Sequence, residues 1–179
     1  MRYIIILLFI PIMTFCQEFS SEEKMSNEFN NIVNEFRSNN FSEVIKLADE
    51  FLKKTDDIFY SSHTLFYKGL SFLSFNDIDN SLNYFNEAIK LSPKSHFYNS
   101  RATAFMAAEQ WTNVLEDTTD GLKLTNKDNP DDNEIRYSLL TQAAVAKFFL
   151  DKDYCKELVM ANEIKTLGPD VILSIGPCL

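Results

Sequence analysis

The chain has 179 residues, of which 45% are hydrophobic and 24% are charged, so it can form one packed core and is not a disordered acidic tail. Only four glycines and five prolines leave little turn chemistry for an all-β fold, and the apolar residues recur every three or four positions, which predicts an all-α domain. A formal net charge of −9 repels phosphate backbones and disfavours nucleic-acid binding.

Residues 1–16 are typical of an export signal. Arg2 precedes an apolar run over residues 3–10, which is followed by Pro11 and, further on, by Cys16. The apolar segment is shorter than the roughly twenty residues that a helix needs to cross a bilayer, so we expect it to be cleaved. Cleavage after Cys16 would release a periplasmic or secreted protein, whereas cleavage before Cys16 would expose a cysteine for lipid attachment. An uncleaved anchor is the third alternative.

After the export signal, the apolar periodicity predicts one helical domain over residues 21–169. Asn40 and Glu43 are expected to form a capping pair at the start of the second helix. Gly168 is expected to stop the last helix, and the apolar tail over residues 170–179 to cover the last hairpin. The helical hairpins are predicted at residues 21–54, 59–91, 95–124 and 132–167.

One motif occurs clearly in this domain and returns in a weaker form. The clear copy places small residues at Gly69 and Ser81, where two helices would cross, with Phe85 beside the crossing. The weaker copy aligns Ala102 with Gly69, which gives a sequence spacing of 33 (102 − 69). The same spacing relates two further pairs, Phe72 with Phe105 and Ile78 with Trp111. We call it the repeat spacing.

These motifs resemble tetratricopeptide repeats, specifically in the middle of the chain and more weakly in the outer two hairpins. The resemblance implies a right-handed superhelical stack of antiparallel helix hairpins, an α-solenoid of about four hairpins whose first helices line an inner face. A face this apolar is expected to hold a peptide or helix, or to be filled by part of this chain. The contact residues expected from the resemblance are His63, Phe66, Leu70, Leu73, Asn99, Arg101, Met106 and Phe149.

We therefore expect a non-enzymatic scaffold or adaptor of a bacterial type of cell envelope, which binds another protein on its inner face. The alternative is a lipid-anchored structural subunit of an envelope complex, which would contact the membrane only through Cys16. An enzyme is the third class, favoured only by His63 and His96, and two imidazoles without a third ligand make a poor metal site. The acidic loop at residues 128–134 lacks the glycine and ligand spacing of an EF-hand. No metal or cofactor is expected.

Two cysteines remain after the export signal. In an oxidising compartment two thiols suggest one bridge, and we expect a disulfide between Cys155 and Cys178 that restrains the tail. Two free thiols are the alternative.

Overall fold

The computed structural model describes residues 6–168, with side chains described from residue 22 onward. This part of the chain is all-α, as predicted, and contains no strand. Among the described residues, no helix is long and apolar enough to cross a membrane. The side chains of the predicted export signal and the tail over residues 170–179 lie outside the described residues. The α-helices are α1 (Ile6–Arg37), α2 (Phe41–Phe51), α3 (Ile58–Ser74), α4 (Ile78–Leu91), α5 (Ser95–Ala107), α6 (Trp111–Lys123), α7 (Asn133–Phe149) and α8 (Cys155–Ile164), with a short 3-10 helix, η1 (Pro130–Asp132), before α7.

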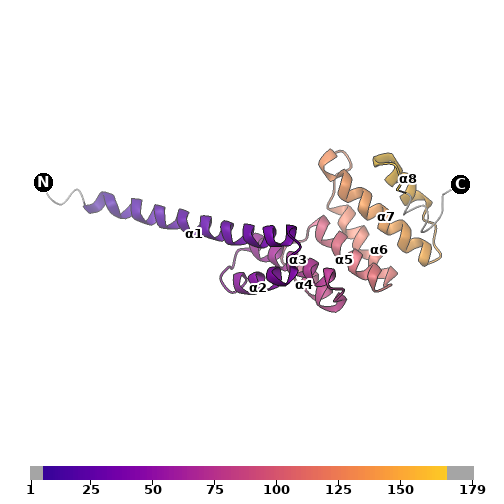
Figure 1. The fold of residues 1–179 in the computed structure, drawn as a ribbon. Coiled ribbons are helices and arrows are strands. Elements are labelled where there is room, and N and C mark those ends of the chain that lie inside the picture. Colours follow the sequence, from indigo (N-terminus) through magenta and orange to yellow (C-terminus); the bar gives the residue numbers. More distant parts are fainter. Residues whose placement is uncertain (1–5, 169–179) are drawn as a thin grey trace.

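Figure 1 shows the helices following one another in sequence order from α1 to α8. Each helix packs against the next one along the chain. The odd-numbered helices also contact one another in series, α1 with α3, α3 with α5 and α5 with α7. In the described part of the chain, no such contact joins α2 with α4, α4 with α6 or α6 with α8. The row of helices is therefore more tightly packed along its odd-numbered side.

Four short turns, one after each of α1, α3, α5 and α7, share a single backbone geometry. One residue in each turn lies in the left-handed region, and the next residue donates its N–H to the carbonyl five positions back at 2.8 to 2.9 Å. This pair of features is the Schellman motif, which satisfies the last carbonyls of a helix and reverses the chain. The left-handed residues are Asn39 (φ 60°), Asn76 (φ 58°), Glu109 (φ 55°) and Asp151 (φ 54°).

The prediction that Asn40 and Glu43 form a capping pair at the start of α2 is wrong. Asn40 does occupy the N-cap position, but its side chain makes no capping hydrogen bond. Its amide Nδ2 instead donates to Oε2 of Glu35 in α1 at 2.7 Å. The amide is therefore used to join the two helices of the first hairpin.

The crossing of α3 and α4 depends on the small residue that the motif placed there. A Cβ atom at Gly69 would lie 2.8 Å from the ring of Phe85 and 3.3 Å from the backbone oxygen of Ser81. Phe85 and Ser81 are fully buried, and so is Ala102, which takes the place of Gly69 in the next hairpin. The small residues let the backbones approach until the aromatic ring fills the remaining space.

Candidate functional site

The predicted contact residues lie on the odd-numbered helices α3, α5 and α7, but they differ in accessibility. Leu70, Leu73 and Met106 are half-buried. Phe66 is only 8% exposed and stacks on the buried ring of Phe97, with ring centroids 4.7 Å apart. Phe66 is therefore a core residue, and a partner has little of its surface to contact.

Arg101 joins three helices. In α6, Asp117 accepts two hydrogen bonds from the guanidinium, with Nε to Oδ2 at 2.9 Å and Nη2 to Oδ1 at 2.6 Å. In α4, Asn86 Oδ1 accepts a third from Nη1 at 2.6 Å. Burial raises the pKa of Asp117, and the Arg101 guanidinium opposes that rise. These contacts occupy Arg101 inside the protein, so we leave it out of the surface proposed below.

Lys68 makes equivalent contacts one hairpin earlier, and it precedes Arg101 by the repeat spacing. Its Nζ donates to Asp49 Oδ1 in α2 at 2.5 Å and lies 4.1 Å from the centre of the Tyr84 ring in α4. Tyr84 precedes Asp117 by the same spacing. Each cation thus contacts one residue of the preceding helix. Each also contacts the same repeat position of the following helix, which is Tyr84 for Lys68 and Asp117 for Arg101. We call the two sets of contacts the Lys68 clasp and the Arg101 clasp.

A polar network lies between α5 and α7. Asn99 Oδ1 accepts a hydrogen bond from Ser138 Oγ at 2.7 Å. Gln142 Nε2 donates to Thr103 Oγ1 at 3.0 Å and to the backbone oxygen of Asn99 at 3.3 Å. The side-chain oxygen of Gln142 is buried and has no hydrogen-bond partner. Asn99, predicted to give polar specificity, thus has its side chain engaged by the neighbouring helix, whereas Thr103 remains exposed.

His63 and His96 are neighbours, with ring centroids 5.9 Å apart. Nδ1 of His63 lies 2.8 Å from the backbone oxygen of Phe59, and its ring also packs on the Phe59 ring at 4.2 Å. Burial, with smaller effects of His63 and Lys94, lowers the pKa of His96 to about 4. In the described residues, no third His, Cys, Asp or Glu joins the pair to form a metal-binding group. At neutral pH His96 therefore behaves as an uncharged ring in an aromatic cluster.

Phe149 lies at the C-terminal end of α7 and is the most exposed of the predicted contact residues, at 52%. Its ring stacks on Trp111 of α6, with centroids 4.2 Å apart and planes inclined by 10°. The neighbouring Phe148, which we did not predict as a contact, is 40% exposed and lies edge-on to Phe149 at 5.4 Å. The sequence signal that could have identified this exposed cluster is the pair of adjacent phenylalanines just before the turn.

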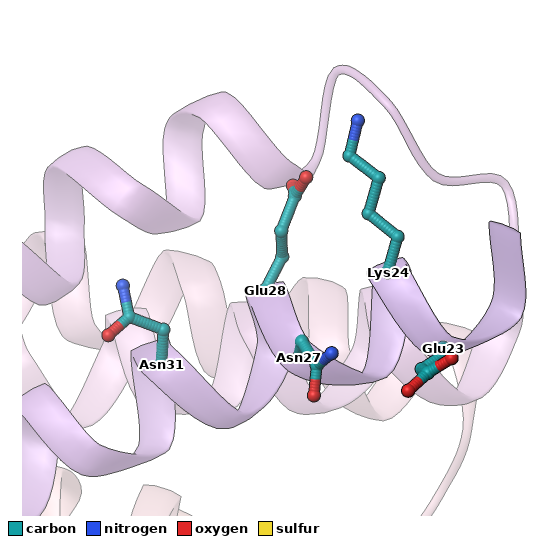
Figure 2. Close-up of a pocket in the computed structure, with 5 residues that line it drawn as sticks. All are labelled: Glu23, Lys24, Asn27, Glu28 and Asn31. Atoms are coloured by element: carbon teal, nitrogen blue, oxygen red, sulfur yellow. The ribbon is translucent and has the colours of Figure 1, made fainter. Parts of the chain in front are cut away.

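An open depression of 540 Å³ lies on the polar side of α1. Figure 2 shows Lys24, Glu28 and Asn31 projecting from one side of the helix, and Asn27 and Glu23 from another. Glu28 Oε2 accepts a hydrogen bond from Lys54 at 3.0 Å. These side chains are exposed or half-buried and of both charges, which is the chemistry of a solvated helix surface.

Cys155 begins α8 and is disulfide-bonded in the structure. The sulfur that bonds to it lies outside the described residues, as Cys178 does. The specific pairing of Cys155 with Cys178 stays a prediction.

Comparison with known proteins adds no family to this description. No protein-family model matches the chain, and no curated protein matches its sequence.

Proposed function

We propose that the chain is a non-enzymatic protein-binding scaffold of the tetratricopeptide type, exported to the cell envelope. In this proposal the helix hairpins form a right-handed superhelical stack, and the odd-numbered helices line its inner face. That face holds an apolar peptide or helix of another protein.

The packing of the odd-numbered helices is the observation that supports this proposal best. A row of hairpins bends toward the side on which its helices are closest. Among the helices that the structure describes, only the odd-numbered ones contact one another in series. The four shared turns and the two clasps further support a repeated unit in the middle of the chain, because both clasp cations keep the repeat spacing. A repeated unit of this kind needs its neighbours to bury its apolar faces, and it leaves one continuous surface along the stack.

The side chains that remain accessible on this face suit an apolar partner. Leu70, Leu73 and Met106 are half-buried, and Thr103 is exposed beside them. Half-buried aliphatic side chains around a small exposed polar residue can pack against the apolar side of a helix. We therefore assign the proposed partner surface to these residues rather than to Phe66 or Arg101.

Site-specific crosslinking in the native cell tests the proposal. A photo-reactive phenylalanine analogue replaces Leu73 or Met106 on the inner face, and Leu91 or Val159 as controls on even-numbered helices. The control side chains are 44% and 56% exposed, so they are at least as accessible. We expect one discrete adduct from positions 73 and 106 and none from positions 91 and 159. Equal adducts from all four positions, or adducts from the controls alone, would contradict an inner binding face.

A substitution that blocks the inner face tests the proposal independently. Thr103→Arg places a long charged side chain on the inner face at an exposed position. It removes the hydroxyl that accepts one of the two hydrogen bonds from Gln142 Nε2, so thermal unfolding checks that the variant keeps its fold. Thr112→Arg is the matched control on α6, where the threonine is also exposed. The adduct formed from position 73 should disappear in the Thr103→Arg background and persist in the Thr112→Arg background. Its persistence in both would place the partner elsewhere.

A further inference from the structure

The third and fourth turns bring exposed aromatic rings and carboxylates to one edge of the molecule. The half-buried Trp111, which follows the third turn, stacks on the exposed Phe149, which precedes the fourth. Phe148 extends this group, and its ring also lies edge-on to Tyr154 at 5.8 Å. We call Trp111, Phe148 and Phe149 the aromatic edge. Its rings belong to two successive hairpins, so the stacking fixes the two turns beside each other.

The turns that flank the aromatic edge are acidic. Glu109 lies just before Trp111 and Asp151 just after Phe149, and both are exposed left-handed turn residues. Asp153 adds a third carboxylate, and Lys152 is the one basic residue in these two turns. Lys152 and Lys123 line a neighbouring open depression together with Glu116 and Asp120. Within the two turns carboxylates therefore outnumber basic groups, in a chain whose formal net charge is −9.

Exposed aromatic rings with carboxylates beside them suit a cationic ligand. The face of an aromatic ring attracts a guanidinium or ammonium group, and a carboxylate next to the ring adds hydrogen bonds and charge. A guanidinium group is favoured because it stacks on a ring and presents planar donors at the same time. We propose that the aromatic edge binds a basic segment of the partner protein, with arginine side chains placed on Phe148 and Phe149 and their charge against Glu109 and Asp151. This names the partner's chemistry and rests on the protein-binding function proposed above.

Binding of a defined peptide tests the inference on the full mature chain. The probe is a fluorescein-labelled peptide in which arginines alternate with glycine and serine, and the control probe carries citrulline, an uncharged isostere, in place of each arginine. Fluorescence anisotropy should show binding of the arginine peptide alone, and binding should weaken as the salt is raised from about 50 mM to about 500 mM.

Three variants locate the site. Phe149→Leu keeps an apolar side chain but removes the ring, and should weaken binding roughly two- to fivefold. The double variant Glu109→Asn with Asp151→Asn removes both charges while keeping residues that tolerate the left-handed region, and should weaken binding by a similar factor. Phe59→Leu is the control, because Phe59 is 55% exposed at the other end of the odd-numbered helices. Circular dichroism checks that each variant keeps the helicity of the parent.

The binding measurements distinguish support for the inference from its failure. Loss of affinity in both edge variants and unchanged affinity in Phe59→Leu supports the inference. Equal binding of the citrulline peptide, no binding of either peptide, unchanged affinity in the edge variants, or loss only in Phe59→Leu overturns it. The crosslinks from positions 73 and 106 are measured independently, so a failure at the aromatic edge leaves the inner-face proposal standing.

Discussion

The hairpins α3/α4 and α5/α6 place equivalent residues at equivalent sites, yet they use different chemistry at those sites. Lys68 of α3 pairs with Asp49 of the preceding helix, α2, and the Asp49 side chain is 50% exposed. In α5/α6 the cation Arg101 pairs with Asp117, whose side chain is 3% exposed. Position within the repeated unit therefore determines that each cation meets the same position of the following helix, Tyr84 for Lys68 and Asp117 for Arg101. The residue type at that position determines where the ion pair forms, and burial determines how much it matters for stability.

The largest expected effect comes from removing the two clasp cations. Arg101→Met leaves Asp117 buried without its guanidinium, and we expect the free energy of unfolding to fall by about 3 kcal/mol. Lys68→Met leaves Asp49 largely in water, so we expect a loss of about 1 kcal/mol or less. Urea unfolding of the two variants measures the difference. Equal losses would mean that the burial of the acidic partner does not distinguish the clasps.

Filling the small-residue crossing of α3 and α4 should have the next largest effect. Gly69→Ala puts a Cβ atom 2.8 Å from the Phe85 ring, which must move within a packed core. We expect a loss of roughly 2 kcal/mol, which overcomes the better helix propensity of alanine. Gly168→Ala is the control, because no atom of residues 6–168 lies within 4 Å of its added Cβ. If thermal unfolding shows Gly69→Ala to be as stable as the parent, the crossing is less tight than described.

The aromatic and histidine cluster should make stability depend on pH. The pKa of His96 is lowered to about 4 in the folded protein, so between about pH 6.5 and pH 4 the unfolded chain binds a proton that the folded protein does not. The free energy of unfolding should therefore fall as the pH is lowered through this window, by about 1 kcal/mol once partial solvent screening is allowed for. The measurement is urea unfolding at several pH values for the parent and for His96→Gln.

His96→Gln serves as the reference because it removes this titration and keeps a neutral polar side chain. Carboxylates titrate in both proteins, so the difference between the two pH profiles isolates the imidazole. If the free energies of unfolding of the parent and of His96→Gln changed with pH in parallel, folding would not lower the pKa of His96.

The smallest expected effect comes from a turn residue, and it raises the free energy of unfolding instead of lowering it. Glu109 and Asn76 occupy the same left-handed position and are separated by the repeat spacing, but asparagine tolerates this region better than glutamate. Glu109→Gly should raise the free energy of unfolding by about 0.5–1 kcal/mol, and Asn76→Gly should change it less. Thermal unfolding of both variants gives the comparison. A larger gain at position 76 would show that turn strain does not follow residue type here.

Much of the fold could be predicted from the sequence because it depends on periodicity and on residue size. Apolar spacing located the helices. Gly69 marked one crossing because an added Cβ atom would meet the Phe85 ring, and the fully buried Ala102 marked the equivalent place in the next hairpin. The turns were harder, since their left-handed residues are asparagine, glutamate and aspartate rather than glycine. Asn40 was assigned a capping role that depends on a side-chain rotamer, which spacing alone does not determine.

The predicted binding surface was less accurate for a physical reason. A resemblance places residues on one face of a helix, but it does not show how deeply each one is buried by its neighbours. Phe66 and Arg101 both lie at the expected positions, yet Phe97 covers the first and Asp117 engages the second. The pair Lys68 and Arg101 offered a usable signal, because two cations at the repeat spacing, on helices with no other Lys, Arg, Asp or Glu, indicate a shared internal contact.

Duplication of one repeat unit most directly tests the central claim that position within the unit determines the contacts. A second copy of residues 76–108, inserted after residue 108, keeps the repeat spacing. The first Arg101 then meets the copied Tyr84 at the equivalent position, and the second Arg101 meets Asp117. The control insertion of residues 76–103 breaks that register. We predict that the in-register protein keeps the parental helicity per residue and unfolds cooperatively with higher stability, while the control loses helicity. Loss of folding in the in-register protein, or equal behaviour of the two insertions, would contradict the account.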